Sequence, residues 1–144
     1  MQAALVMIGR IETPYKTLGE CPRNVDSQGP LCSLVIDPTY RDAMLGLDAG
    51  REILVLYWLG NADRTRLRQS PSHIGKLTGA FALRSPHRPN PIGAAVVRIV
   101  EVRENAIVVR GLDCIDGTAL LDIKPAMKPE SGPERFSPGR PGAE

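Results

Sequence analysis

The sequence predicts a mainly β protein, a small antiparallel β-barrel with one or two short helices. About seven short segments rich in β-branched and apolar residues recur along the chain, separated by turn residues. Only Asp37 to Gly46 carries clear helix signals. Glu104-Asn105 and Asp116-Gly117 each fit a tight turn between adjacent strands. Successive antiparallel hairpins of this kind are typical of small closed or half-closed barrels.

Each strand is predicted from its own pattern. Glu52 to Leu59 is nearly continuous in apolar residues, so it is expected to be a central strand. Leu31 to Ile36 alternates weakly between apolar and polar residues and is predicted as a second strand. The other predicted strands are Leu5–Ile11, Gly79–Leu83, Gly93–Arg103, Ala106–Arg110 and Ala119–Ile123.

The predicted helix has recognisable ends. Asp37 can cap it, Pro38 suits its first turn and Gly46 ends it. The residues expected to face the core are Ala43, Met44 and Leu47. Residues 1–125 are expected to form one domain, and the Pro/Gly-rich residues 126–144 an extended or disordered tail.

Composition and motifs exclude several classes of protein. No apolar run is long enough to cross a membrane and the N-terminus lacks a signal-peptide pattern, so we expect a cytoplasmic protein without a membrane segment. Cys21, Cys32 and Cys114 are odd in number and lack a CxxC spacing, so neither a disulfide framework nor a metal site is expected. No GxGxxG, P-loop, HExxH or GxSxG motif is present. A Rossmann cofactor domain is therefore not indicated.

The region from Asp63 to Asn90 combines a local positive charge with a stiff loop. The net charge of the chain is only +2, but this region holds six basic residues against one acid, together with both histidines. The excess charge suits phosphate groups, although a solvated surface is an equal alternative. In the segment Arg84-Ser-Pro-His-Arg-Pro-Asn90 the prolines fix the backbone, so its polar side chains are preorganised. We interpret it as a functional loop.

Four polar clusters follow predicted strands: Pro22 to Asn24, Gly60 to Arg64, Arg84 to Asn90, and Asp113 with Asp116-Gly117-Thr118. In a barrel, loops at strand ends gather at the rims, so these clusters are expected to converge on one mouth. The two aspartates have alternative roles as general bases, hydrogen-bond acceptors or turn formers, and for Asp116 the turn role is favoured. Asp122 and Lys124 are equally consistent with a cross-strand ion pair and with a functional role.

The segment Arg84-Ser-Pro-His-Arg-Pro-Asn-Pro-Ile-Gly93 resembles a motif of the TrmO (TsaA-like) family of S-adenosylmethionine-dependent tRNA methyltransferases. Ile8 to Tyr15 is similar to the family's opening strand and Pro22-Arg23-Asn24 to its Pro-Arg-Gln turn. Leu112 to Thr118 and Leu121 to Pro125 resemble its closing Asp-Gly-Thr and Asp-Ile-Lys-Pro motifs. The likeness covers the chain from about Ile8 to Pro125.

This resemblance implies a β-barrel methyltransferase of non-Rossmann type. It also implies a homodimer that binds S-adenosylmethionine near the subunit interface. The family's activity is methylation of the exocyclic nitrogen of threonylcarbamoyl-adenosine, the nucleotide next to the tRNA anticodon. The cofactor contacts carried over by position are Arg23, Asn24, Val25, Gly60, Asn61, Arg84, Ala94, Gly111, Leu112 and Asp113.

The delocalised lone pair of a carbamoylated adenine nitrogen makes proton removal necessary before methyl transfer. Asp113, Asp116 and His87 are the candidate general bases. Arg64, Arg66 and Arg88 are expected to hold phosphates of the anticodon loop, and Tyr15 to stack on the unpaired base. Two alternatives stay open: a regulatory module that binds S-adenosylmethionine without tRNA methylation, and a small-molecule methyltransferase on the same barrel.

Overall fold

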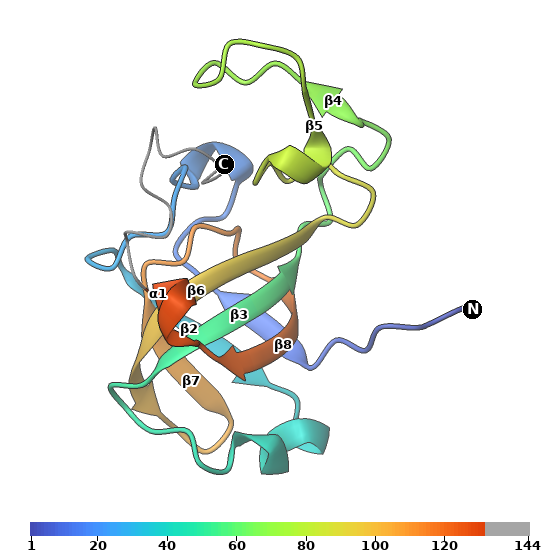
Figure 1. The fold of residues 1–144 in the computed structure, drawn as a ribbon. Helices are drawn as coiled ribbons and strands as arrows, with labels where there is room; N and C mark the ends of the chain where they lie inside the picture. The colour runs from blue at the N-terminus through green and yellow to red at the C-terminus, as the bar shows by residue number, and fades with distance from the viewer. Residues whose placement is uncertain (132–144) are drawn as a thin grey trace.

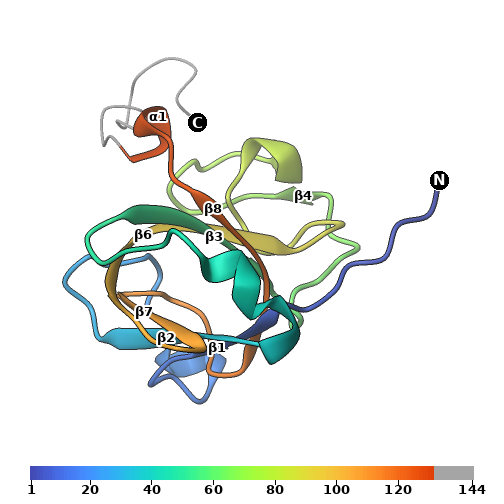
Figure 2. The same ribbon diagram turned by 90° about the horizontal axis from the view of Figure 1, so that it is seen from below.

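Six antiparallel strands close into a barrel in the computed structural model, which describes residues 1–131 (Figures 1 and 2). Around the barrel the strands follow the order β1-β2-β7-β6-β3-β8, and β8 pairs with β1 to close it. Their bounds are β1 Gly9–Glu12, β2 Leu31–Ile36, β3 Glu52–Trp58, β6 Ile92–Val102, β7 Ala106–Arg110 and β8 Thr118–Pro125. The mainly β, antiparallel barrel predicted from the sequence is therefore confirmed.

Alternating side chains of the strands fill the barrel. Along β3, Ile53, Val55 and Tyr57 are buried while their neighbours are half-buried, as expected for a strand with partners on both sides. Gly93 of β6 lies opposite Tyr57, and a Cβ at this position would overlap the tyrosine ring. A glycine is therefore required here by the close approach of the ring.

Neighbouring barrel strands run antiparallel, so the connections alternate between the two rims of the barrel. Residues 13–30, 59–91 and 111–117 join successive barrel strands at one rim, and residues 37–51 and 103–105 do so at the opposite one. The four polar clusters found in the sequence all fall in the first three connections. The topology thus places all four clusters at the same end of the barrel, which we call the site rim, and their convergence on one mouth stays a prediction.

The first strand is shorter than predicted. β1 begins at Gly9, and the segment before it leaves the barrel (Figure 1). Leu5, Val6 and Met7 are 58%, 57% and 47% exposed, because no strand within residues 1–131 pairs with them. The predicted strand from Leu5 was therefore wrong at its start, since apolar residues alone do not supply a hydrogen-bonding partner.

Gly79 to Leu83 was also predicted wrongly as a strand. Only Thr78–Gly79 (β5) is extended, and it pairs with Arg68–Gln69 (β4). The next residues, Ala80–Ala82, form the 3-10 helix η3. Ala80 and Leu83 are buried and the two residues between them are exposed, which is the three-residue period of a 3-10 helix rather than the two-residue period of a strand.

The predicted helix after Asp37 exists as a 3-10 helix, η2 (Pro38–Met44). The Asp37 carboxylate caps it by accepting a hydrogen bond from the Thr39 amide at 2.9 Å. Met44 and Leu47 pack against the core, whereas Ala43 is exposed, contrary to the prediction. A second 3-10 helix, η1 (Leu18–Glu20), interrupts the first long loop.

The C-terminal end differs in part from the predicted tail. Lys128–Ser131 forms one turn of α-helix, α1, rather than extended chain. Residues 132–144 lie outside the described residues, and the division of the chain at residue 125 stays a prediction. Within residues 1–131, no helix is long and apolar enough to span a membrane, and no three His, Cys, Asp or Glu side chains gather as a metal site.

Candidate functional site

Two connections at the site rim are fastened to each other at Gly111. The Asp26 amide donates to the Gly111 carbonyl at 2.9 Å, and the Gly111 amide donates to the Pro30 carbonyl at 2.8 Å. Gly111 has a φ of +83°, and a Cβ on it would overlap the Asp26 carbonyl oxygen. The loop that carries Arg23, Asn24 and Val25 is therefore fixed beside Gly111, with Val25 packed on the core and the other two exposed.

Asp113 lies half-buried at this rim. Its Oδ1 accepts a hydrogen bond from the Tyr57 hydroxyl at 3.2 Å. Burial raises the pKa of Asp113 above its usual range, and the Tyr57 hydrogen bond partly opposes that rise. Burial, and then the charge of Asp113, raise the pKa of the Tyr57 hydroxyl, so it stays a proton donor to the carboxylate. A partly desolvated carboxylate with a raised pKa is a better proton acceptor than an ordinary surface aspartate.

Sequence reasoning missed Tyr57. It was counted among the apolar residues of the central strand, although a tyrosine hydroxyl inside a core requires a hydrogen-bonding partner. Tyr57 is only 4% exposed, and its partner is the Asp113 carboxylate. A β-bulge in the pairing of β3 with β8 falls between Leu56 and Tyr57. Such irregularities re-aim side chains near functional sites.

Arg84 brings a positive charge to the same place. Its Nη2 donates to the Ala94 carbonyl at 3.3 Å. Its charge also opposes, in part, the rise in the pKa of the nearby Tyr57 hydroxyl. The structure thus brings together at the site rim five residues from three parts of the chain: Arg84, Ala94, Gly111, Leu112 and Asp113. Gly60 and Asn61 form the exposed turn after β3, beside the end of the proline-rich loop, where the Leu59 amide donates to the Pro91 carbonyl at 2.8 Å.

Asp116 lies in a different environment. Its Oδ2 accepts from the Lys16 ammonium at 2.8 Å and its Oδ1 from the Thr13 amide at 3.0 Å. The hydrogen bond from Lys16, followed by that from Thr13, lowers the pKa of Asp116. Gly117 follows with a φ of +86°, so the turn role favoured from the sequence is confirmed. A carboxylate with a lowered pKa is a poor proton acceptor, which argues against Asp116 as the base.

His87 serves to hold the loop. Its Nδ1 accepts a hydrogen bond from the Asp63 amide at 2.9 Å, and its carbonyl accepts from Gln69 Nε2 at 3.2 Å. The lone pair of Nδ1 is therefore occupied by this hydrogen bond. His87 holds the loop in this structure, and its role as a general base stays a prediction.

Arg88 is likewise committed to the loop. Its Nη1 donates to the Leu83 and Ser85 carbonyls at 2.9 and 2.8 Å, and its Nη2 donates to the Ala80 carbonyl at 3.0 Å. A half-buried guanidinium with three carbonyl partners holds the chain rather than a phosphate. The expectation that Arg88 binds RNA stays a prediction, which these three hydrogen bonds do not favour.

The other basic residues stay near the surface of the rim. Arg64 donates to the Pro89 carbonyl at 2.8 Å and to Asn90 Oδ1 at 3.3 Å, and its guanidinium lies 5.2 Å from the centre of the Trp58 ring. Arg66 is 47% exposed and forms a 3.8 Å ion pair with Asp63. Both arginines are exposed enough to meet a ligand from solution.

Tyr15 also belongs to the site rim. Its carbonyl accepts from the Asp116 amide at 2.7 Å. Partial desolvation, and then the neighbouring Cys32 and Cys21, raise the pKa of the Tyr15 phenol, which places the ring beside the loop of Asp26. All three cysteines are free, and Cys114 is buried as expected.

Two cavities lie away from Asp113. One, of about 430 Å³, lies on the outer wall of the barrel between β1, β2 and β7 and includes Lys16 and Asp116. The other, of about 370 Å³, lies at the opposite rim beside η2. Asp122 and Lys124 border this second cavity and form a 2.9 Å ion pair within one strand, not across strands as considered from the sequence.

The fold is a closed antiparallel barrel rather than a Rossmann domain, and its site rim gathers polar and charged residues. A family model described as the tRNA-methyltransferase O N-terminal domain matches residues 10–129. The chain therefore belongs to the TrmO family of methyltransferases, as the sequence motifs indicated.

Known proteins are similar over most of the chain. The "Probable S-adenosyl-L-methionine-binding protein VirR" of Rhizobium radiobacter is 47% identical over 123 residues, which cover 85% of this chain and 70% of the relative. A "tRNA (adenine(37)-N6)-methyltransferase" of Rattus norvegicus is 30% identical over 139 residues, covering 91% of this chain and 32% of the relative.

A solved structure, "Crystal structure of TrmO", superposes with a TM-score of 0.77 at 26% identity. The match covers all of this chain and 65% of the solved one. The chain thus spans less than two thirds of both the rat enzyme and the solved TrmO chain. The name of the VirR relative agrees with the cofactor expected from the sequence, S-adenosylmethionine.

Proposed function

We propose that this protein transfers a methyl group from S-adenosylmethionine to the exocyclic nitrogen of threonylcarbamoyl-adenosine beside the tRNA anticodon. The observation that carries the proposal is Asp113, a half-buried carboxylate with a raised pKa that accepts a hydrogen bond from Tyr57, whose hydroxyl in turn lies near the Arg84 guanidinium. The similarity to the rat tRNA (adenine(37)-N6)-methyltransferase supports this choice of acceptor.

The residues at the rim suit the cofactor. S-adenosylmethionine carries a sulfonium cation, a carboxylate, an amine and a ribose, and it supplies an electrophilic methyl group. The Arg84 guanidinium suits the cofactor carboxylate, and the exposed Arg23 on the adjoining loop offers a second cation. The main chain at Gly111 and Leu112 suits the polar edges of the nucleoside, and the Asp113 carboxylate suits an amine or hydroxyl donor.

In the proposed reaction, the Asp113 carboxylate accepts the proton from the carbamoylated N6–H. The nitrogen lone pair then forms the N–CH₃ bond as the S–CH₃ bond breaks, and the sulfonium charge is neutralised. Tyr57 holds the carboxylate in place through its hydroxyl, and Arg84 fixes the position of the ligand next to it. Asp113 therefore acts as the general base and Tyr57 as a positioning residue.

We assign the RNA contacts to the exposed residues of the rim. Arg64 and Arg66 are placed to meet phosphates of the anticodon loop, and Tyr15 is placed to contact a nucleotide near Asp113. Arg88 takes no part in this assignment, because its guanidinium binds three carbonyl groups. A substrate of this kind places the protein in the cytoplasm, where tRNA matures.

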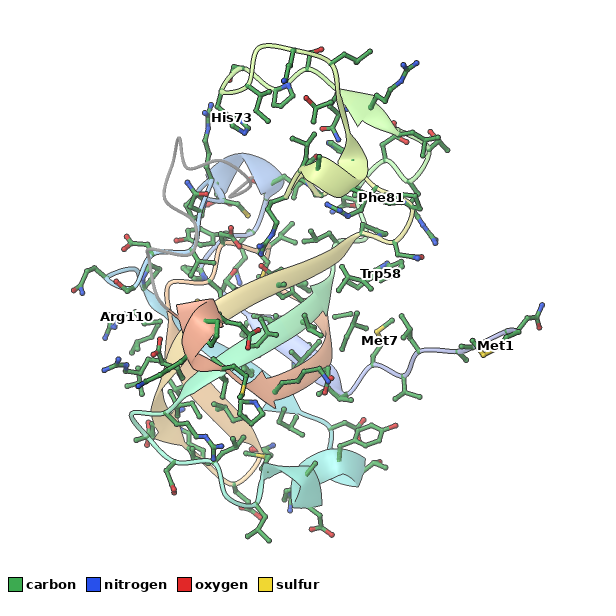
Figure 3. The ribbon with its side chains drawn as sticks, viewed as in Figure 1. Met1, Met7, Trp58, His73, Phe81 and Arg110 are labelled. Carbon is green, nitrogen blue, oxygen red and sulfur yellow. The ribbon has the colours of Figure 1, made fainter. Side chains whose placement is uncertain are left out.

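A homodimer is part of the proposal. Leu5, Val6 and Met7 form an exposed apolar segment that extends away from the barrel (Figure 3). Contiguous exposed apolar residues are typical of contact surfaces.

Light scattering of the full chain tests the dimer. We expect twice the chain mass for the wild-type protein and a shift towards one chain mass for Val6→Asp. Val100→Asp, at a position 44% exposed on the outer face of β6, is the control and is expected to stay dimeric. A wild-type protein of one chain mass at micromolar concentration would contradict the dimer.

Transfer of label from methyl-labelled S-adenosylmethionine tests the activity. With bulk tRNA from cells that lack the modification, we expect label in the RNA, and less label with Asp113→Asn. A second candidate, a binding protein without transferase activity, is favoured by the printed name of the VirR relative. It predicts saturable cofactor binding in calorimetry and no labelled product. Label found only in small metabolites would point instead to a small-molecule methyltransferase.

A further inference from the structure

Phe81 is an aromatic side chain that the fold holds in solvent. It is 86% exposed, and two further apolar residues of the same connection, Leu67 and Leu77, are 63% and 59% exposed. The Ala80 amide donates to the Leu67 carbonyl at 2.8 Å, so the segment that carries Leu67 lies beside the segment that carries Phe81. Figure 3 shows Phe81 on the part of the connection that lies beyond the end of the barrel.

The exposure of Phe81 is built into the structure. Its neighbours Ala80 and Leu83 are buried, and the Leu83 amide donates to the Ala80 carbonyl at 3.1 Å. The Arg88 guanidinium binds the carbonyls of both residues. Ser85 Oγ donates to Gln69 Oε1 at 2.8 Å and ties the same turn to β4. A turn fixed by this many contacts presents its aromatic ring with little loss of entropy on binding.

The surroundings of Phe81 favour a polyanion. The connection from Asp63 to Asn90 carries six basic residues and one acid. Arg66 and Arg68 flank Leu67 at the start of β4, and Arg84 follows Phe81 by three residues. An exposed aromatic ring among cations is the composition of a surface for single-stranded nucleic acid, where bases stack and phosphates pair with arginine.

The position of Phe81 relates it to the proposed chemistry. Arg84 contacts Ala94 and acts on Tyr57, the partner of Asp113. The η3 turn and the carboxylate therefore belong to adjoining parts of one rim. A nucleotide whose target nitrogen meets Asp113 has its neighbours in the RNA close beside it, since stacked nucleotides of one strand are spaced by about 3.4 Å.

We infer that Phe81 is the stacking platform for an unpaired base adjacent to the methylated adenosine in the anticodon loop. The inference rests on the proposed tRNA substrate and names a specificity residue for it. Tyr15, chosen from the sequence for base stacking, is only half exposed, and it lies outside the basic connection from Asp63 to Asn90. Phe81 has the larger exposed face and the basic surroundings.

Binding of a synthetic anticodon stem–loop that carries threonylcarbamoyl-adenosine tests the inference. For Phe81→Ala we expect about 5- to 100-fold weaker RNA binding, the range measured for loss of one aromatic–base stack. Binding of S-adenosylmethionine by calorimetry is expected to stay unchanged. Phe81→Trp is expected to restore RNA binding, whereas Phe81→Leu, which keeps the apolar bulk without the aromatic face, is not. Leu45→Ala, at a 94% exposed position beside the opposite rim, is the matched control.

Fluorescence gives a second readout. The wild-type chain has one tryptophan, Trp58, so the added signal of Phe81→Trp reports on the new position. Quenching of that added signal by the stem–loop, absent when the base next to the target is replaced by an abasic site, supports stacking. Unchanged quenching with the abasic stem–loop overturns it.

The outcomes separate this inference from the proposed function. If the wild-type protein binds and methylates the stem–loop and Phe81→Ala does so equally well, the stacking role is wrong and the function stands. If the wild-type protein does neither, the proposed function has failed, and the inference fails with it. If Phe81→Ala reduces the mass of the assembly in light scattering together with RNA binding, Phe81 belongs to a contact between subunits and the stacking role is again overturned.

Discussion

Asp113 and Asp116 lie three residues apart in one connection, yet their carboxyl groups have opposite environments. Asp113 is half-buried beside a buried tyrosine, and burial raises its pKa. Asp116 accepts hydrogen bonds from an ammonium and a main-chain amide, which lower its pKa. The comparison shows how a single short loop separates a reactive carboxylate from a structural one. Desolvation prepares Asp113 to accept a proton, whereas pairing keeps Asp116 ionised and fixed.

The largest expected effect is on catalysis. Asp113→Asn is expected to lower kcat by about 10²- to 10⁴-fold, because the amide cannot accept the proton of the target nitrogen. The loss is measured as methyl transfer to tRNA at saturating cofactor, with folding followed by circular dichroism.

Asp116→Asn is the matched control for that loss. It is expected to keep kcat within a few-fold of the wild-type value, since Asp116 holds Thr13 and Lys16 and does not face Tyr57. Equal losses in the two variants would remove the distinction between the carboxylates.

The next effect concerns stability. Gly111→Ala is expected to lower the free energy of unfolding by about 2–4 kcal/mol, because a left-handed residue is strained and its Cβ would displace the Asp26 carbonyl. Gly117→Ala has a similar φ of +86° but open space around the new Cβ, so it is expected to cost about 1–2 kcal/mol. Urea unfolding measures both. A smaller cost at Gly111 than at Gly117 would show that the contact with Asp26 does not hold the rim together.

A smaller effect is a shift in pH dependence. The Tyr57 hydrogen bond lowers the pKa of Asp113 against the effect of burial, so Tyr57→Phe is expected to raise that pKa further. If ionised Asp113 is the base, activity appears as pH rises through its pKa. The acid limb of the kcat/KM profile is therefore expected to move to higher pH in Tyr57→Phe. A shift to lower pH would mean that the limb reports another group.

The smallest effect is on acid stability. The folded-state pKa of Asp116 is lowered by Lys16, so the ionised carboxylate adds stability above its unfolded pKa, and this is lost as pH falls through the folded value. In Lys16→Met, less stability is available to lose, so the melting temperature is expected to fall less between pH 7 and pH 3. Thermal melts at low salt measure the difference. An unchanged pH dependence would show that the exposed pair contributes nothing.

The barrel was predictable because its physical signals are local. Alternation of apolar residues and turn pairs gave the strands from Leu31 to Ile36 and from Ala106 to Arg110 at their observed bounds. The family motifs and the strand order placed the polar clusters at one rim. At Leu5 and at Ala80, apolar runs were wrongly predicted to be strands, because these residues have no strand to pair with in the described part of the chain.

The details of the site required the structure because they depend on contacts between distant residues. The sequence does not reveal that His87 accepts from the Asp63 amide or that Arg88 binds three carbonyls. Nor does it reveal that Tyr57, 56 residues before Asp113, donates to its carboxylate. Residue types indicated the chemistry of the rim, while these long-range hydrogen bonds decide which residues remain free to perform it.

A mass spectrum of nucleosides tests the central claim most directly. tRNA that carries unmethylated threonylcarbamoyl-adenosine is incubated with S-adenosylmethionine and the full chain, then digested. The proposed function predicts that this nucleoside gains the mass of one methyl group with the wild-type protein and with Asp116→Asn, and remains unmodified with Asp113→Asn. An unmodified nucleoside with the wild-type protein, or full methylation by Asp113→Asn, would contradict the account.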